Sequence, residues 1–387
     1  MTPRLALKTL LLAALLLPRA AGAFAQAPCG SLLTTDTKLT HDLICPSHGL
    51  SIGADGVTLD CDGHTLRGSG ASGGDGVRIS GFGGVTIRNC TILEFGTAIR
   101  AEQAPDLRVV RNLLKDTIGG IRCDSCPGAR IEANRLEGVF SQVGLTRSPD
   151  ALIMDNEMIR HAKGGSMTAR ESPRVRVSGN RGDSGALLDR CDDAVLENND
   201  WAGNATVSFF STTGCWIAGN TLVRGDAEPS YGGSIQLRAA KGCSVVQNRI
   251  SGFLPVFVSA QPGYLGTDAL GSSDRNLIEG NDIHGSAYGI LLFGGSENRI
   301  VRNVVEDASL GLAILALVDS GIEIRVPADR NLVEGNSIRG GDFGVYTWDA
   351  SATQFVANDV AGHGIGIVEG SIEPGDQAPN RYSMNSV

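Results

Sequence analysis

The sequence predicts an all-β fold, a single-stranded right-handed parallel β-helix (solenoid) of about 12–14 coils with about 22 residues per coil. A short phrase, found at residues 129–138, returns along the chain at spacings close to 22 residues. Apolar residues inside each copy alternate with the period of a strand and not of a helix. Glycine supplies 52 of the 387 residues, which favours many tight turns between short strands.

An asparagine marks the same position in most copies, as Asn134 does between Ile131 and Leu136. A second short strand precedes each asparagine strand, so a unit holds about three strands and cannot bury its apolar side alone. We therefore expect stacked units with a shared core and stacked asparagines, whose amides both donate and accept hydrogen bonds. Cys90 takes the same slot, and Asp62 is a looser match. The asparagines are Asn112, Asn134, Asn156, Asn180, Asn199, Asn220, Asn248, Asn281, Asn303, Asn336 and Asn358.

The chain divides into four expected segments. Residues 1–27 are expected to be a signal peptide, because basic residues precede a short apolar stretch and small-residue cleavage sites. A retained N-terminal anchor is the alternative. Residues 28–56 are expected to form an N-terminal cap, residues 57–370 the β-helix, and residues 371–387 a C-terminal tail or cap, since the ends of a solenoid expose strand edges. These segments predict a secreted or periplasmic protein.

Export permits disulfides, and the chain has nine cysteines. We expect Cys29 and Cys45 to bond across the predicted cap. Cys123 and Cys126 form a C-x-x-C motif, which is expected to be a local turn disulfide or two thiols in a turn. The alternative is a redox or metal role, but the motif lacks the second pair or the βαβ context that would favour it.

Two further cysteines, Cys215 and Cys243, occupy the same slot in adjacent coils. Two stacked thiols are the favoured interpretation there, with a disulfide as the alternative. The six histidines are scattered and form no H-x-H or H-x-x-x-H pair, so the spacing predicts no metal site. The identity of any cofactor stays open.

The net charge of −9 argues against nucleic-acid binding, which depends on Lys and Arg neutralising phosphates. After removal of the predicted signal peptide, no segment is long and apolar enough to span a membrane. The sequence therefore predicts neither a nucleic-acid partner nor a membrane span, and the oligomeric state stays open.

Several stretches resemble secreted bacterial right-handed β-helix repeat proteins, namely residues 52–66, 76–80, 84–89 and 331–336. That grouping includes pectate-lyase-like polysaccharide enzymes and the periplasmic β-helix proteins associated with copper delivery to nitrous oxide reductase. The resemblance covers residues 29 to about 370 and implies the fold. It also implies action on a polysaccharide or a role in metal delivery. The D-P-H tripeptide of alginate epimerases, a pectate lyase calcium site and the paired aspartates of polygalacturonases have no counterpart in this sequence.

Two coils are longer than the rest, with 33 residues between successive asparagines. Their extra residues fall within 261–274 and 318–329, on the same edge, and long loops on a rigid scaffold often carry binding sites. The strands beside them are expected to point apolar residues outward. Either the insertions fold over this stripe, or the stripe is a sugar-stacking groove centred on Tyr346 and Trp348. The outward residues are Phe257, Leu291, Phe293, Leu315, Tyr346 and Trp348.

Five residues near that stripe are candidates for catalysis, because paired carboxylates serve glycoside hydrolysis and a base with a nearby arginine serves β-elimination of a uronic acid. They are Asp319, Glu323, Arg325, Asp349 and His284.

A second candidate site is a column of outward arginines, Arg108, Arg130 and Arg176, interrupted by Leu152. A local basic face could bind an anionic polysaccharide. The alternative is a solvated face with cross-strand charge pairs.

Three functions follow as hypotheses. The first is a secreted protein that binds or cleaves an extracellular polysaccharide, with lyase, hydrolase or epimerase chemistry if it is an enzyme. The second is a non-catalytic structural or adhesive β-helix. The third is a periplasmic accessory protein for metal delivery.

Overall fold

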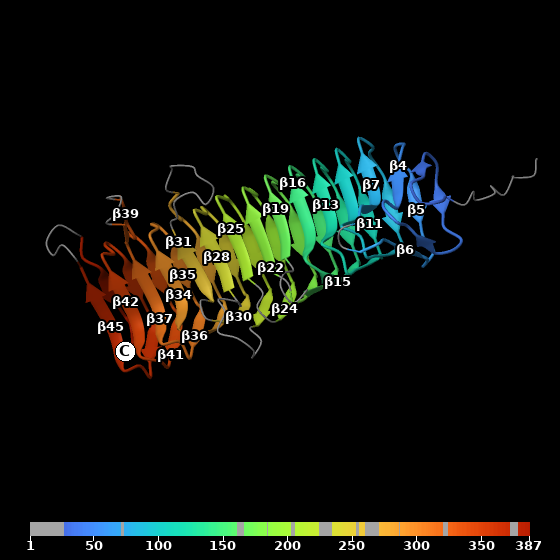
Figure 1. The fold of residues 1–387 in the computed structure, drawn as a ribbon. Coiled ribbons are helices and arrows are strands. Elements are labelled where there is room, and N and C mark those ends of the chain that lie inside the picture. The colour runs from blue at the N-terminus through green and yellow to red at the C-terminus, as the bar shows by residue number, and fades with distance from the viewer. Residues whose placement is uncertain are drawn as a thin grey trace, which may run out of the picture.

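The chain folds into one long solenoid of parallel strands. The computed structural model describes residues 27–70, 73–160, 166–183, 185–202, 206–223, 234–252, 255–259, 271–285, 287–319, 324–371 and 378–387. These residues form strands and no helix. Figure 1 shows them stacked as an elongated rod, with the blue N-terminal coils at one end and the red C-terminal coils at the other. Three sheets of 15, 15 and 14 strands, here called A, B and C, run along its length, which confirms the predicted β-helix.

Sheet A holds the longest strands. Residues about one unit apart pair in parallel register, as Ile99 does with Ile121 and Arg100 with Arg122. Strand alternation buries Ile121 and exposes Arg122. In spatial order the strands are β1 (Leu32–Leu33), β4 (Leu50–Ile52), β7 (Asp75–Ser80), β10 (Thr97–Glu102), β13 (Gly119–Asp124), β16 (Ser141–Thr146), β19 (Ser166–Arg170), β22 (Gly185–Asp189), β25 (Thr206–Phe210), β28 (Ser234–Arg238), β31 (Val256–Ser259), β34 (Tyr288–Phe293), β37 (Leu310–Leu315), β42 (Phe343–Trp348) and β45 (Ile365–Gly370).

Sheet B follows sheet A in every coil, and most of its strands have three residues with only the central one turned inward. Ile131 of β14, for example, is fully buried. The strands are β2 (Thr37–Lys38), β5 (Thr58–Asp60), β8 (Thr86–Arg88), β11 (Arg108–Val110), β14 (Arg130–Glu132), β17 (Leu152–Met154), β20 (Arg176–Ser178), β23 (Val195–Glu197), β26 (Trp216–Ala218), β29 (Ser244–Val246), β32 (Leu277–Glu279), β35 (Arg299–Val301), β40 (Leu332–Glu334), β43 (Gln354–Val356) and β46 (Arg381–Ser383).

Sheet C closes each coil before the chain returns to sheet A. Its strands are β3 (Leu43–Ile44), β6 (Thr65–Arg67), β9 (Thr91–Leu93), β12 (Leu113–Lys115), β15 (Arg135–Val139), β18 (Glu157–Arg160), β21 (Arg181–Gly182), β24 (Asp200–Ala202), β27 (Thr221–Val223), β30 (Arg249–Gly252), β33 (Asp282–Gly285), β36 (Val304–Glu306), β41 (Ser337–Arg339) and β44 (Asp359–Ala361). A separate antiparallel hairpin, β38 (Leu317–Asp319) and β39 (Ile324–Val326), lies within the second predicted insertion.

The asparagines stack at the turn from sheet B to sheet C. The backbone N–H of Asn134 donates to Oδ1 of Asn156 at 2.9 Å, and its Nδ2 donates to the same oxygen at 3.0 Å. Nδ2 of Asn134 also donates to the carbonyl of Val109 at 2.8 Å. These bonds satisfy the amide groups at a buried corner, where unpaired polar groups would destabilise the fold. The predicted asparagine stack is confirmed.

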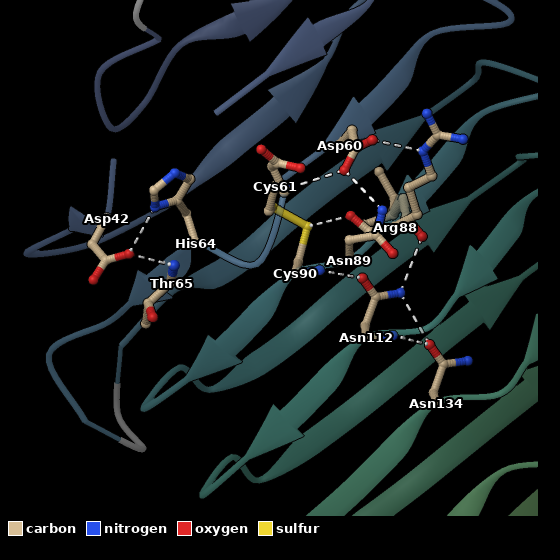
Figure 2. Close-up of a disulfide and its surroundings, with 12 residues drawn as sticks. Asp42, Asp60, Cys61, His64, Thr65, Arg88, Asn89, Cys90, Asn112 and Asn134 are labelled. Carbon is tan, nitrogen blue, oxygen red and sulfur yellow. Dashed lines mark hydrogen bonds and ion pairs between the residues drawn. A yellow bond between two sulfur atoms is a disulfide. The ribbon is translucent and has the colours of Figure 1, made fainter. Parts of the chain in front are cut away.

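A disulfide occupies the N-terminal end of this ladder, as Figure 2 shows. Cys90 bonds to Cys61, and the backbone N–H of Cys90 donates to Oδ1 of Asn112 at 3.0 Å. Asp62 is a looser match to the asparagine position in the sequence. In the structure Cys61 is the buried residue, and Asp62 adopts a left-handed turn conformation with φ of 50°.

The remaining cysteines give one confirmation and two corrections. Cys29 bonds to Cys45, as expected. Cys215 bonds to Cys243, so the favoured pair of stacked thiols is wrong there. Cys123 is unbonded, so the predicted local disulfide is wrong as well.

The physical reason lies in the coil itself. Cys126 occupies a turn position, whereas Cys123 points into the core from β13 between Ala101 and Leu145. Cys126 is likewise unbonded. The two thiols therefore belong to different columns of stacked residues, Cys123 to a core column of sheet A and Cys126 to the column at the following turn.

The two ends of the rod continue the strand pairing. Within residues 28–56, the short strands β1, β2 and β3 pair with β4, β5 and β6 of the next coil. At the other end, β46 pairs with β43. Residues 1–26, 261–270 and 320–323 of the predicted signal peptide and insertions lie outside the described residues.

Candidate functional site

The outer face of sheet A changes character along the rod. Its N-terminal strands point mainly charged and polar residues outward, including Arg78, Arg100 and Arg122. Its C-terminal strands point large apolar residues outward, and all of those that the sequence singled out lie on this face in adjacent rows. The predicted inward set is buried, and it consists of Val256, Val258, Ile290, Leu292, Leu312, Ile314, Val345 and Thr347.

The aromatic rings of β42 form a cluster near the C-terminal end of this face. The rings of Tyr346 and Trp348 lie nearly parallel, 8° apart, with centroids separated by 6.3 Å. Phe343 approaches Tyr346 edge-on, with centroids 6.5 Å apart. Trp348 remains 37% exposed. A Cβ added at Gly370 would lie 2.2 Å from the Trp348 ring, so this glycine in the next coil allows the indole to lie close against the backbone.

The N-terminal end of the aromatic stripe was not predicted from the sequence. The guanidinium of Arg238 lies 5.5 Å from the ring centroid of Phe210 and 5.4 Å from that of Phe257. Nη2 of Arg238 also donates to Oε1 of Gln236 at 2.7 Å. A cation between two aromatic faces is held by their quadrupoles, so these residues form one amphipathic patch. The signal in the sequence is the alternation of outward residues in β25, β28 and β31, which becomes informative only when the register is known.

The two catalytic candidates whose side chains the structure describes are His284, on sheet C, and Asp349, in a buried turn. His284 points outward from sheet C, where its ring nitrogens lie 3.2 Å from Asp282 and 3.8 Å from Glu306. Asp349 lies in the turn after β42, is 3% exposed and has φ of 49°. One of its carboxylate oxygens accepts a hydrogen bond from Oγ of Ser371 at 2.9 Å, which gives Asp349 a turn-stabilising contact.

The other three candidates belong to the second insertion. Asp319 and Arg325 lie on the two strands of the hairpin, in neighbouring rows, because Val318 pairs with Arg325 and Asp319 with Ile324. Glu323 lies outside the described residues. The hairpin therefore brings the backbone of Asp319 and Arg325 together.

The arginine column exists on the outer face of sheet B, in the order that the sequence predicts. Arg108 pairs with Arg130, Arg130 with Leu152, and Leu152 with Arg176. Arg176 bonds to Glu197 at 2.7 Å, and Arg130 lies 3.7 Å from Glu132. Two of the three guanidiniums thus have charged neighbours in sheet B, in keeping with a solvated face.

Two of the three free thiols, Cys126 and Cys191, lie at the turn from sheet A to sheet B. At this turn, residues of successive coils are joined by a ladder of hydrogen bonds, here called the turn ladder. The backbone N–H of Cys126 donates to Oγ of Ser148 at 3.0 Å, and that of Cys191 donates to Oγ1 of Thr212 at 3.2 Å. Sγ of Cys191 lies 3.4 Å from the carbonyl oxygens of Ala169 and Asp189. Burial raises the pKa of Cys191 to about 11. Thiols thus replace hydroxyls in a repeated structural position.

The thiols of the C-x-x-C motif influence each other. The hydrogen bond with Cys126 and burial raise the pKa of Cys123 well above its ordinary value. The same hydrogen bond lowers the pKa of Cys126.

Among the described residues, no helix is long and apolar enough to cross a membrane.

Two family models match the chain. The one described as "Periplasmic copper-binding protein (NosD)" matches residues 56–235 and 142–309, and the one described as "Right handed beta helix region" matches residues 264–360. The expected right-handed β-helix and the expected family resemblance are therefore confirmed. No curated protein matches the sequence.

Solved structures share the chain path at low identity. The Dettilon tailspike protein is 15% identical, with a TM-score of 0.48, over 90% of this chain and 67% of that chain. DFA-IIIase from Arthrobacter chlorophenolicus A6 without its lid is 13% identical, with a TM-score of 0.37, over 78% and 70%. The A-module of the Azotobacter vinelandii mannuronan C-5 epimerase AlgE6 is 14% identical, with a TM-score of 0.37, over 92% and 90%. These similarities carry no information on function.

The first family description names copper, and the side chains that the structure describes do not fit a copper centre. Soft metal ions prefer thiolate, thioether and imidazole ligands. In the parts of the chain that the structure describes, His, Cys, Asp and Glu form no group of three or more that could hold a metal ion. Cys126 and Cys191 are committed to the turn ladder described above, so no step of the function is assigned to copper.

Proposed function

The chain belongs to the family described as periplasmic copper-binding protein (NosD), and from this premise we propose that it is an exported β-helix that binds a polysaccharide along the outer face of sheet A. Three disulfides support a location in an oxidising compartment outside the cytoplasm. Periplasmic and extracellular compartments both contain polysaccharides as potential ligands.

The aromatic patch on β42 carries this proposal. Sugar rings have apolar C–H faces and polar edges, and the exposed ring of Trp348, beside the partly buried ring of Tyr346, offers a complementary surface. An exposed apolar area of this kind requires a cover or a ligand. The stripe runs parallel to the rod from Phe210 to Trp348, across strands β25 to β42, which suits an extended polymer.

Binding is favoured over cleavage. Glycoside hydrolysis requires two carboxyl groups about 5–10 Å apart on either side of the scissile bond. His284 lies on sheet C, and Asp349 is buried in a turn. The described candidates therefore supply no converging acid and base beside the aromatic rings.

Replacing Trp348 tests the proposal. We expect Trp348→Ala to weaken polysaccharide binding about tenfold, which corresponds to about 1.4 kcal/mol, because the variant loses the most exposed stacking ring. The measurement is isothermal titration calorimetry on the mature protein, with the strongest ligand from an array of neutral, uronate-containing and sulfated glycans.

The matched control is Trp216→Ala. Trp216 is 43% exposed but lies on sheet B, so its loss should leave the affinity unchanged. Equal effects of both substitutions, or no binding to any glycan, would contradict the proposal. The second result would instead support a structural or adhesive β-helix.

A further inference from the structure

A polar hollow lies on the outer face of sheet A, far from the aromatic rings. It has a volume of about 330 Å³ and surrounds Gly144 of β16. Between β16 and β42 there are eight strand-to-strand steps, or about 38 Å at the usual spacing. The charged and hydroxyl side chains around Gly144 are Arg100, Glu102, Arg122, Asp124, Ser141, Thr146 and Thr168.

Nothing in the backbone requires a glycine at position 144. A Cβ added there would meet only Oγ1 of Thr168, at 3.7 Å, which is an ordinary contact. Every other glycine in the described strands of sheet A would bring an added Cβ to within 3.0 Å of a neighbouring atom. Those glycines are Gly76, Gly119, Gly120, Gly185, Gly289, Gly311, Gly344, Gly366 and Gly370.

Glycine weakens a strand interior and often marks a bulge, a bend, or the close approach of a ligand or another backbone. Apart from those of its two chain neighbours, no backbone atom lies within 4 Å of a Cβ added at Gly144, so a ligand is the interpretation that we follow. In the outward column, Gly144 lies between Arg122 and Thr168. A larger residue here would fill the hollow while leaving the strand pairing intact. The missing side chain is therefore what creates the space.

The hollow contains one guanidinium, that of Arg122, for which the described part of the chain offers no ion-pair partner. Arg78, Arg100 and Arg122 form an outward column in consecutive rows, so like charges stack at a spacing that is unfavourable without counter-charges. Nε of Arg100 donates to both carboxylate oxygens of Asp75, at 3.0 and 2.9 Å. Arg122 is exposed and makes no ion pair with the described residues. An anion beside Arg122 would neutralise it.

Room for the Arg122 side chain comes from a second glycine. A Cβ at Gly119 would lie 3.0 Å from Nε of Arg122. The guanidinium therefore lies over its own strand, at the rim of the hollow. Gly119 thus makes space for the Arg122 guanidinium, and Gly144 makes space beside it.

The same hollow holds hydrogen-bond acceptors and hydroxyl groups. Asp124 is occupied, because Nη2 of Arg147 donates to both of its carboxylate oxygens, at 2.6 and 2.7 Å. Glu102 makes no ion pair with the described residues and can accept hydrogen bonds from hydroxyl groups. A free cation, a free carboxylate and two threonine hydroxyls together match a ligand with one anionic group and several hydroxyls.

We propose that the hollow at Gly144 binds an acidic sugar residue, with Arg122 neutralising its carboxylate or sulfate group and Glu102 accepting a hydrogen bond from its hydroxyls. The inference rests on the proposed function and narrows the ligand to acidic polysaccharides. The aromatic patch then stacks a more distant part of the same polymer.

The test compares substitutions in the hollow with a matched substitution outside it. The probes are oligouronates, sulfated oligosaccharides and neutral oligosaccharides on one array, which distinguishes carboxylate from sulfate. The strongest acidic ligand is then titrated against each variant. Arg122→Gln should weaken it about tenfold, whereas Arg78→Gln, in the same column but outside the hollow, should change its affinity less than twofold.

Filling the hollow gives a second, independent variant. Gly144→Leu should weaken acidic binding about tenfold, and Gly144→Ala, whose methyl group fits without a clash, should weaken it less. None of these variants should change the affinity for neutral glycans, and thermal unfolding checks that each one folds. If Gly144→Leu fails to fold, Arg122→Gln and Gly144→Ala still decide the question.

The possible failures are distinguishable. If a glycan binds and Trp348→Ala weakens it, but Arg122→Gln and Arg78→Gln behave alike, only the acidic-sugar site is overturned. Binding of neutral glycans alone leads to the same conclusion. If no glycan binds, the proposed function fails together with this inference.

Discussion

At the scale of single residues, two turn positions decide how the coils stack. Asn156 accepts a hydrogen bond from the backbone N–H of Asn134 and donates its own backbone N–H to Asn180. At the turn from sheet A to sheet B, serine, threonine or cysteine makes similar hydrogen bonds between coils. The asparagine ladder was predictable because its spacing is regular. The thiol role of Cys191 was not, because its equivalence to serine appears only when the coils are aligned in space.

Cys191 supplies a prediction for the dependence of stability on pH. Burial raises the pKa of this thiol from 9.0 to about 11 in the folded protein. Because the thiol has a higher pKa in the folded protein than in the unfolded chain, its contribution to the free energy of unfolding is fully present below the unfolded-state pKa. This contribution is lost as the pH rises towards the folded-state pKa. Between pH 9 and 11 the wild type should therefore lose of the order of 2 kcal/mol that Cys191→Ser, which does not titrate, retains.

Urea unfolding at pH 7, 9 and 10.5 measures this difference. Other titrating groups are shared by both proteins, so the comparison isolates the thiol. Parallel loss of stability in the wild type and in Cys191→Ser would show that the buried thiol is not linked to folding.

At the scale of elements, the repeat predicted the strands, their alternation and the outward aromatic stripe. Each follows from a period of two within a strand and of about 22 residues between coils. The bond between Cys61 and Cys90 escaped prediction because its separation of 29 residues departs from that period. His284 was placed near the stripe because linear distance does not reveal which of the three faces a strand joins.

Deleting one complete coil tests this modular arrangement. Removing residues 113–134 joins Asn112 to Arg135, and β15 then takes the place of β12 beside β9, because Leu113 pairs with both Thr91 and Arg135. Contacts in a solenoid are mainly between neighbouring coils, so we expect a folded protein whose melting temperature changes by about 5 °C or less.

Removing only residues 113–123 is the control. It removes β12 and most of β13, so that β11 and β14, both strands of sheet B, follow each other with no complete strand of sheet C or sheet A between them. This deletion should abolish cooperative melting, which is followed by circular dichroism. Equal melting of the two deletion variants would mean that coil register does not determine the fold.

At the scale of the whole molecule, the rod has three long faces with different chemistry. Sheet C presents ion pairs such as that of Arg135 with Glu157. Sheet A combines the hollow at Gly144 with the aromatic patch about 38 Å away. A polymer that reaches both sites should bind more tightly than an oligosaccharide that reaches one, because the second contact becomes intramolecular.

The sequence predicts the overall shape of the molecule but not the positions of the catalytic candidates or the role of Gly144. Coil number and rod shape follow from counting repeats. The positions of the two described catalytic candidates could not be predicted, because no period defines the direction of the turn that holds Asp349, and the distance along the chain does not assign His284 to one of the three sheets. Gly144 likewise resembles any other glycine until the space around it is measured.

Protection of the tryptophans from oxidation tests the central claim most directly. The protein has three tryptophans, of which Trp201 is buried, Trp216 is exposed on sheet B and Trp348 is exposed on sheet A. Hydroxyl-radical footprinting with mass spectrometry would compare their oxidation with and without saturating polysaccharide. We expect strong protection of Trp348 and no change at Trp216. Equal protection of both, or protection of Trp216 alone, would contradict binding along the outer face of sheet A.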